Sequence, residues 1–209
     1  MAMHISVYLA VLAGGKASRM RGIYKPLLKI CGKTLIEIII GNIGDIAEKI
    51  YIVVHTLEQL KLLSPLKDKL KFEVLIDLHK ERSPVTGMYT ASKHISSGII
   101  MFSPADTPFL TYHAYVKLLK YLEKYDGAVP VWPNGYIEPL VSVYNSCMLK
   151  EALEKALREG NFRARAPLDY LNVIKVPVNE VFKEPKIETF NINTFEEYRV
   201  AEEICNKML

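Results

Sequence analysis

Two adjacent glycines follow an apolar, strand-like run near the start of the chain, and basic residues lie close behind them. The run Ile5–Leu12 leads into Gly14–Lys16, with Arg19 and Lys25 shortly beyond. Successive glycine N–H groups can approach an anion closely, and three cations in one loop suit a triphosphate. The loop contains neither GxxxxGK[S/T] nor GxGxxG. It therefore predicts phosphate binding by another motif, or else an ordinary glycine turn with solvated basic residues.

Two aspartates follow apolar runs that have the composition of buried strands. Asp77 comes directly after Phe72–Ile76, and Asp106 comes shortly after Gly98–Phe102. A carboxylate at the carboxyl end of a parallel strand lies where α/β proteins bind their ligands. Each aspartate also fits a plainer role, Asp106 as a turn former or helix cap and Asp77 as a solvated residue at a strand end.

The other reactive residue types form no metal or nucleophile pattern. The histidines lack HxxxH and HExxH spacing, so we expect no zinc site. Cys31, Cys147 and Cys205 are widely spread without a CxxC pair, so we expect neither a disulfide framework nor structural zinc. We expect Cys147 to be a buried structural thiol. Arg163 and Arg165 fit either a bidentate grip on a phosphomonoester or a solvated basic loop.

Short apolar runs alternate with longer amphipathic ones, which is typical of βαβ units on a mainly parallel sheet. Thr34–Glu37 and Thr194–Glu197 each read as a capping box that opens a helix, and the Asn-Gly pair in Pro133–Gly135 indicates a β-hairpin. The expected strands are Ile5–Leu12, Tyr51–Val54, Phe72–Ile76, Gly98–Phe102, Ala128–Trp132, Ile137–Tyr144 and Val173–Val178. The expected helices run from Thr34 to about Ile43, over Thr86–Ser96, Thr111–Tyr125 and Ser146–Glu159, and from Thr194 to about Lys207.

The composition is that of a globular chain. Its 209 residues are 50% apolar and 24% charged with a net charge of +4, which excludes a disordered protein. Basic and acidic residues are interleaved, so the charge favours anionic ligands in general and does not indicate nucleic acid. No apolar run reaches the roughly 18 residues that a membrane helix needs. The apolar N-terminal run lacks a preceding Lys or Arg, so we expect a cytoplasmic protein.

The stretch LAGGKASRMRGIYKPLLKICGKTLI, residues 12–36, resembles the opening signature of the nucleoside-diphospho-sugar-type nucleotidyltransferases. Four later segments, in the expected order, narrow the resemblance to the molybdenum cofactor guanylyltransferase family. These segments are Ser83–Met88 with Asp77 upstream, Pro104–Phe109, Glu138–Leu140 and Phe190–Glu197. The resemblance covers essentially the whole chain.

The resemblance implies a Rossmann-like three-layer α/β/α fold with a mainly parallel sheet and an inserted β-hairpin. It implies a single nucleotidyltransferase domain over 1–209, with a nucleotide-binding half, 1–127, and an acceptor-side half, 128–209. The implied reaction is Mg²⁺-dependent transfer of GMP from GTP to the molybdopterin cofactor, with release of pyrophosphate. We expect a monomer or weak oligomer that contacts cofactor-delivering and cofactor-receiving proteins transiently and binds neither nucleic acid nor a membrane.

By the same resemblance, Arg19, Lys25 and Asp106 are the expected catalytic residues, and Asp106 is the expected Mg²⁺ ligand. The expected nucleotide-binding residues are Leu12, Ala13, Gly14, Gly15, Lys16, Lys25, His55, Asp77, Pro84, Gly87 and Asp106. The expected acceptor-binding residues are Glu138, Arg163, Arg165, Asn191 and Asn193. Asp77 suits guanine because a carboxylate accepts from guanine N1–H and N2–H; the solvated strand-end residue remains the alternative.

Three residues depart from the family pattern. Arg21 stands where Gly is usual, Tyr24 where Asp is common, and His55 where an Asn that contacts nucleotide is expected. His55 still carries a hydrogen-bond donor. The departures keep open a GTP-binding regulator without transferase activity. A second alternative is an adenosylcobinamide-phosphate guanylyltransferase, whose family shares the glycine loop and a C-terminal NINT segment, or a related nucleotidyltransferase.

Overall fold

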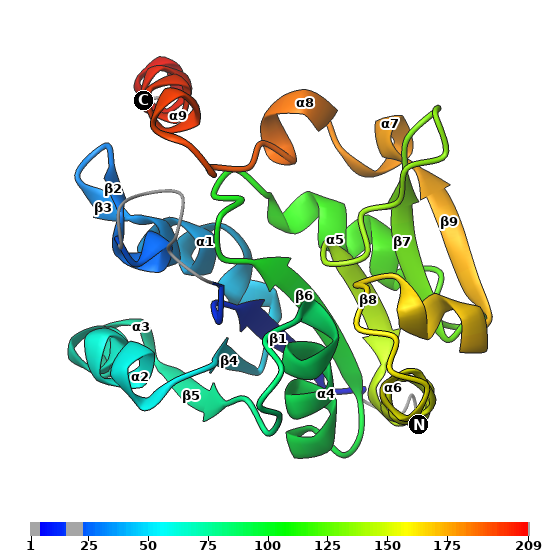
Figure 1. The fold of residues 1–209 in the computed structure, drawn as a ribbon. Helices are drawn as coiled ribbons and strands as arrows, with labels where there is room; N and C mark the ends of the chain where they lie inside the picture. Colours follow the sequence, from blue (N-terminus) through cyan, green and yellow to red (C-terminus); the bar gives the residue numbers. More distant parts are fainter. Residues whose placement is uncertain (1–4, 16–22, 209) are drawn as a thin grey trace.

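The strands form a central, mainly parallel sheet (Figure 1). The computed structural model describes residues 5–15 and 23–208, and within them the strand order is β5-β4-β1-β6-β8-β7-β9. Strand β8 runs antiparallel to both neighbours, and the other pairs are parallel. The strands are β1 (Val7–Leu12), β4 (Lys49–Val54), β5 (Phe72–Ile76), β6 (Ile99–Pro104), β7 (Gly127–Val131), β8 (Ser142–Asn145) and β9 (Val173–Pro177).

Helices cover both faces of the sheet and make three layers. Side chains alternate along a strand, so Leu9 and Val11 pack with α1, α5 and α7 on one face, while Ala10 packs with α4 and α6 on the other. The helices are α1 (Leu35–Ile43), α2 (Leu57–Leu63), α3 (Lys67–Leu70), α4 (Pro84–His94), α5 (Tyr112–Leu119), α6 (Ser146–Arg158), α7 (Val178–Val181), α8 (Pro185–Glu188) and α9 (Phe195–Met208). The predicted three-layer fold is confirmed.

Both predicted capping boxes are present. At the start of α1, the Thr34 hydroxyl accepts the Glu37 N–H at 3.3 Å, and the Glu37 carboxylate accepts the Thr34 N–H at 2.8 Å. Thr194 and Glu197 make the same two bonds before α9: the hydroxyl accepts at 3.2 Å and the carboxylate at 2.8 Å. These bonds satisfy N–H groups that a helix start leaves without intrahelical partners.

The predicted hairpin is present, but its second strand begins later than expected. The Gly135 N–H donates to the Trp132 carbonyl at 2.8 Å, and Gly135 has a φ of +83°, which fits the predicted turn. Strand β8 begins only at Ser142, because Pro139 has no N–H to donate and the chain turns before the strand. Ile137 still pairs with Val131 in an isolated antiparallel bridge, so the expected strand is interrupted over 138–141.

The helix expected over Thr111–Tyr125 is shorter in the structure. Helix α5 ends at Leu119, and the Tyr121 N–H then donates to the Leu118 carbonyl at 3.1 Å in a tighter turn. The Thr111 hydroxyl does not cap the helix; it donates to the buried Glu188 carboxylate at 2.6 Å. The Thr111 hydroxyl thus makes a tertiary contact and no capping bond.

The cysteines differ from expectation. Cys31 and Cys205 form a disulfide across 174 residues, which ties the small hairpin of β2 (Lys29–Ile30) and β3 (Lys33–Thr34) to α9. We expected no disulfide framework and did not predict this bond, because distance along the chain does not set distance in the fold. Cys147 is exposed rather than buried, so the expectation of a buried thiol was wrong.

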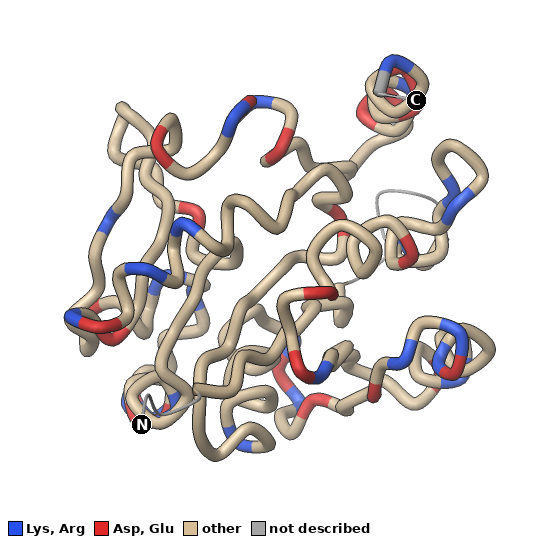
Figure 2. The backbone as a smooth tube through the Cα atoms, turned by 180° about the vertical axis from the view of Figure 1, so that it is seen from behind, with Lys and Arg blue, Asp and Glu red and all other residues tan. Residues whose placement is uncertain are grey.

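Charged residues of both signs are spread over the part of the chain that the structure describes. Figure 2 shows Lys and Arg positions among Asp and Glu positions in many parts of the backbone, whereas the strands β1, β6, β7 and β8 carry neither. Within the described ranges, no helix combines the length and apolar character needed to cross a membrane.

Candidate functional site

A cavity of about 580 Å³ lies at the carboxyl ends of the parallel strands. Chain order reverses at β1, because β4 and β5 lie on one side of it and β6 on the other, and open α/β sheets bind ligands at such a crevice. The lining residues are Leu12, Ala13, Gly14, Gly15, Tyr24, Lys25, Pro26, Val53, Val54, His55, Asp77, Arg82, Ser83, Pro84, Gly87, Pro104, Ala105, Asp106 and Leu140.

The cavity brings together the predicted nucleotide-binding residues. Every member of that set within the described ranges lines it: Leu12, Ala13, Gly14, Gly15, Lys25, His55, Asp77, Pro84, Gly87 and Asp106. The predicted Lys16 and Arg19, and the divergent Arg21, lie outside the described residues. Residues as far apart in the sequence as Leu12 and Asp106 thus line the same cavity.

Lys25 and Asp106 are neighbours at one end of the cavity. Lys25 begins the 3₁₀ turn Lys25–Leu27, and its Nζ lies 3.3 Å from Asp106 Oδ2 and donates to Asn193 Oδ1 at 2.8 Å. The Lys25 and Asp106 side chains are 19% and 28% exposed. A fixed cation and a partly accessible carboxylate therefore lie side by side, an arrangement suited to phosphate and a divalent ion.

The C-terminal segment is held beside Asp106 by two further hydrogen bonds. The Ile192 N–H donates to the Asp106 carbonyl at 2.9 Å, and the Thr107 hydroxyl donates to Asn191 Oδ1 at 2.6 Å. The amide oxygen of Asn191 is thus engaged with the loop after β6. Both predicted asparagines, Asn191 and Asn193, contact the Lys25–Asp106 end of the site.

The two glycines after β1, Gly14 and Gly15, have different surroundings. A Cβ on Gly14 would lie 3.3 Å from the backbone N of His55, closer than ordinary van der Waals contact. A Cβ on Gly15 would meet nothing within 4 Å, although Gly15 lines the cavity. Packing against β4 therefore favours glycine at position 14, and open space beside the cavity surrounds position 15.

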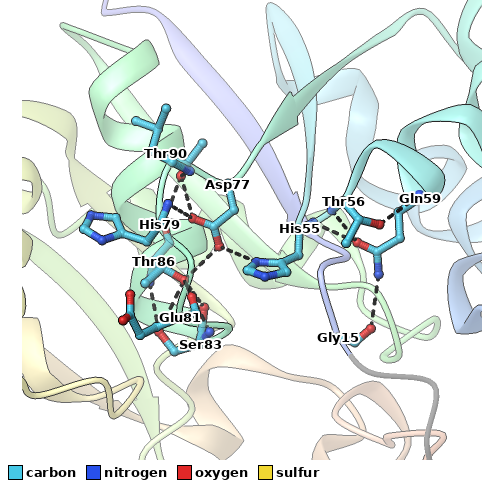
Figure 3. A network of polar contacts seen from close by, with 11 residues as sticks. Gly15, His55, Thr56, Gln59, Asp77, His79, Glu81, Ser83, Thr86 and Thr90 are labelled. Carbon is cyan, nitrogen blue, oxygen red and sulfur yellow. Dashed lines mark hydrogen bonds and ion pairs between the residues drawn. The ribbon is translucent and has the colours of Figure 1, made fainter.

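Two side chains without a predicted role hold this loop. The Tyr24 hydroxyl donates to the Ala13 carbonyl at 3.1 Å, and burial raises the pKa of Tyr24 well above its ordinary value. Gln59 Nε2 donates to the Gly15 carbonyl at 3.3 Å, while its Oε1 accepts the His55 N–H at 2.8 Å (Figure 3). A Thr-x-x-Gln capping-box pattern was the available sequence signal for Gln59.

Asp77 lies in a buried network at the β5 end of the cavity (Figure 3). Its carboxylate accepts from the hydroxyls of Thr86 at 2.8 Å and Thr90 at 3.1 Å and from the His79 N–H at 3.2 Å. Nδ1 of His55 lies 3.5 Å from Asp77 Oδ2, and the Asp77 side chain is 5% exposed. The alternative of a solvated strand-end aspartate is therefore wrong.

Helix α4 begins at the cavity wall. Ser83 Oγ accepts a backbone N–H of the first turn at 3.1 Å, and Pro84 occupies the start of the helix. A Cβ on Gly87 would lie 3.2 Å from Leu12 Cδ2, so glycine lets α4 approach the end of β1. Arg82 immediately precedes the cap, and its Nε is buried without a hydrogen-bond partner among the described residues.

The remaining predicted acceptor-binding residues do not line the cavity. Glu138 accepts from Trp132 Nε1 at 2.8 Å, and burial raises the pKa of its carboxyl group. Leu140, two residues further on, does line the cavity. Arg163 and Arg165 are exposed on a loop outside that lining. The acceptor roles of Glu138 and the arginine pair stay predictions.

Comparisons with known proteins give one consistent family. A family model described as the MobA-like NTP transferase domain matches residues 9–172. A probable molybdenum cofactor guanylyltransferase from Methanosarcina mazei is 30% identical over 193 residues, covering 90% of this chain and 86% of that protein. A protein of the same name from Natranaerobius thermophilus is 31% identical over 208 residues, covering 97% and 98%. The crystal structure of molybdopterin-guanine dinucleotide biosynthesis protein A from Archaeoglobus fulgidus is similar with a TM-score of 0.80 at 31% identity, covering 96% of this chain and 99% of that one.

Proposed function

Since the chain belongs to the MobA-like NTP transferase family and is a nucleotidyltransferase, we propose that it transfers GMP from GTP to the molybdopterin cofactor. The observation that carries the proposal is that Lys25, Asp106 and the glycines of residues 14–15 share one cavity at the carboxyl edge of the sheet. The names of relatives that match the chain over most of its length support the same reaction.

In the proposed reaction, a terminal phosphate oxygen of the acceptor attacks the α-phosphorus of GTP. The bond from the α-phosphorus to the oxygen that bridges to the β-phosphate breaks, and pyrophosphate leaves with the bonding electrons. A phosphomonoester is already ionised near neutral pH, so the step needs neither a general base nor a covalent intermediate. Catalysis then rests on positioning and on neutralising charge.

The Lys25 ammonium supplies positive charge at the phosphate end of the cavity. Its Nζ lies between two side-chain oxygens, at 2.8 and 3.3 Å, so its position is set before substrate binds. The N–H groups of Gly14 and Gly15 supply further donors to phosphate oxygens. Lys16 and Arg19 stay predicted contributors from outside the described residues.

Asp106 is the residue that would hold a divalent metal ion, and we propose Mg²⁺. Within the described ranges, no three His, Cys, Asp or Glu side chains gather into a metal-binding group. A single carboxylate fits Mg²⁺, which takes one or two protein carboxylates and completes its shell with phosphate oxygens and water. When bound with the nucleotide, Mg²⁺ would neutralise charge that develops on the phosphates.

Pyrophosphate release from GTP in the presence of molybdopterin and Mg²⁺ tests these roles. We expect Asp106→Asn and Lys25→Met each to lower turnover at least about 100-fold, the order of loss seen when one charge-stabilising group is removed. The circular dichroism spectrum should not change. Lys33→Met, at an exposed lysine on β3, should keep wild-type turnover. Wild-type turnover in either site variant would overturn the assignment.

A substrate panel separates the proposal from its alternatives. With molybdopterin as acceptor, we expect GTP to release pyrophosphate faster than ATP, CTP or UTP. Release with adenosylcobinamide phosphate but not with molybdopterin would favour the other guanylyltransferase. Tight Mg-GTP binding without pyrophosphate release from any acceptor would favour a regulator.

A further inference from the structure

Two residues that line the cavity each have a buried side-chain nitrogen with no hydrogen-bond partner among the described residues. The atoms are His55 Nδ1 and Arg82 Nε; a third such atom in the described ranges, Ser146 Oγ, belongs to a residue outside the cavity lining. His55 Nδ1 has Asp77 Oδ2 3.5 Å away, whereas Arg82 has no ion pair or hydrogen bond in the part of the chain described. A buried donor without an acceptor is costly, so Arg82 points to a ligand that supplies one.

Arg82 lies at the opposite end of the cavity from the Lys25–Asp106 pair. It belongs to the loop between β5 and α4, and β4 and β1 separate β5 from β6, the strand that leads to Asp106 (Figure 1). With neighbouring strands about 4.8 Å apart, these two strand ends are about 14 Å apart. A nucleotide whose phosphates lie beside Lys25 and Asp106 therefore directs its base toward Arg82.

The carboxylate in the same part of the wall does not neutralise Arg82. The two oxygens of Asp77 receive donors from Thr86, Thr90 and the His79 backbone at 2.8 to 3.2 Å. A carboxylate has about four acceptor sites, and His55 faces the remaining one at 3.5 Å. Asp77 thus does not engage the N–H groups of Arg82, which remain available to a ligand.

We infer that Arg82 reads the guanine base along its Hoogsteen edge, with guanidinium N–H groups donating to O6 and N7. The inference rests on the proposed function and names the residue that selects the nucleotide. Guanine presents two acceptors on that edge, which the planar fork of arginine matches. Adenine presents an amino donor in place of O6, and the pyrimidines have no N7. Each of these bases leaves a guanidinium N–H without an acceptor.

A double-mutant cycle between protein and ligand tests this contact. Dissociation constants of GTP and 7-deaza-GTP are measured by isothermal titration calorimetry, with Mg²⁺ and without an acceptor, for the wild type and Arg82→Met. We expect the wild type to bind GTP roughly 5- to 150-fold more tightly than 7-deaza-GTP, because the analogue leaves a buried donor unsatisfied. In Arg82→Met the two ligands should bind equally. Arg158→Met, an exposed arginine at the end of α6, should keep the wild-type ratio.

Two controls isolate recognition of the Hoogsteen edge. ITP controls for contacts to the 2-amino group, and Arg82→Lys controls for an effect of charge alone. ITP lacks the 2-amino group but keeps O6 and N7, so the ratio of ITP to GTP affinity should be the same in the wild type and Arg82→Met. Arg82→Lys keeps the charge but not the planar fork, and should also lose most of the N7 dependence. A wild-type N7 dependence in Arg82→Lys would mean that charge alone acts, and would overturn the inference.

The results also separate failure of the inference from failure of the proposed function. A wild type that binds GTP no better than ATP contradicts the proposed function and removes the inference with it. A wild type that prefers GTP but binds 7-deaza-GTP equally well overturns the Arg82 contact alone. An Arg82→Met variant that weakens GTP, ATP and 7-deaza-GTP alike assigns Arg82 to the phosphates, and also overturns it.

Discussion

Asp77→Asn would remove one acceptor oxygen from the buried network at the β5 end of the cavity while nearly preserving its shape. Oδ2 accepts the Thr86 hydroxyl at 2.8 Å and lies 3.5 Å from His55 Nδ1, and an amide NH₂ in its place cannot accept. The Thr86 hydroxyl has another acceptor, the Ser83 carbonyl at 2.8 Å, so it is not orphaned. Since a hydrogen bond to a charged group contributes about 1.5–3 kcal/mol, we expect the free energy of unfolding to fall by about 2 kcal/mol.

Urea unfolding followed by circular dichroism measures this loss, which corresponds to a Tm lower by about 4–8 °C for a chain of this size. Asp169→Asn, at an exposed aspartate, controls for the charge change. Thr86→Val removes the donor, and the double variant closes a thermodynamic cycle. Because both single changes break one contact, their effects should overlap by about 1 kcal/mol. The ratio of GTP to ATP affinity should keep its wild-type value.

Loss of GTP preference at unchanged stability would refute this reasoning. It would mean that the Asp77 carboxylate faces guanine N1–H and N2–H and is itself a determinant of base selection. Strict additivity in the cycle would contradict the Asp77–Thr86 hydrogen bond.

Three further predictions concern the elements that hold the site. Tyr24→Phe removes the hydrogen bond to the Ala13 carbonyl at the start of the glycine loop. The free energy of unfolding should fall by about 1 kcal/mol, and isothermal titration calorimetry should show weaker GTP binding. Unchanged stability and affinity would contradict a role for this hydrogen bond. Hydrogen bonds from Lys69 and the helix cap lower the pKa of Glu37 from 4.5 to about 2, so Glu37→Gln should cost about 1 kcal/mol at pH 7. The difference in unfolding free energy between wild type and Glu37→Gln, measured by urea titration, should shrink as pH falls from 4.5 toward 2. Over this range the unfolded state binds a proton at Glu37 before the folded state does. A difference that does not change with pH would contradict the lowered pKa. The Cys31–Cys205 disulfide closes a loop of 174 residues, and the lower entropy of the unfolded chain would stabilise the fold by up to about 5 kcal/mol. Reduction should therefore lower the urea midpoint of unfolding. An unchanged midpoint would mean that the bond does not form.

Features set by local chemistry could be predicted from the sequence. The first strand and both capping boxes depend on residues within a few positions of one another, and they lie where predicted. The mainly parallel sheet follows from the alternation of apolar runs and amphipathic segments. Parallel strands bring their carboxyl ends to one edge, which is why Gly14 and Asp106 line the same cavity.

Features that depend on tertiary contacts were missed. Helices α2 and α3, which pack against β4 and β5, were also not predicted, although leucines recur every three or four residues over 57–70. The Cys31–Cys205 pairing needs α9 to pack beside the β2–β3 hairpin. Tyr24 stood out only as a departure from the family pattern, and Arg82 gave no sequence signal, because the hydrogen bond of Tyr24 and the burial of Arg82 Nε are determined by the folded cavity.

The fate of the α-phosphate distinguishes guanylyl transfer from hydrolysis of GTP. The protein is incubated with molybdopterin, Mg²⁺ and GTP labelled either at the α- or at the γ-phosphate, and the products are separated. Guanylyl transfer predicts that the α-label moves to molybdopterin while the γ-label leaves in pyrophosphate, in equal amounts. Release of the γ-label as inorganic phosphate, with the α-label left in GDP, would contradict guanylyl transfer.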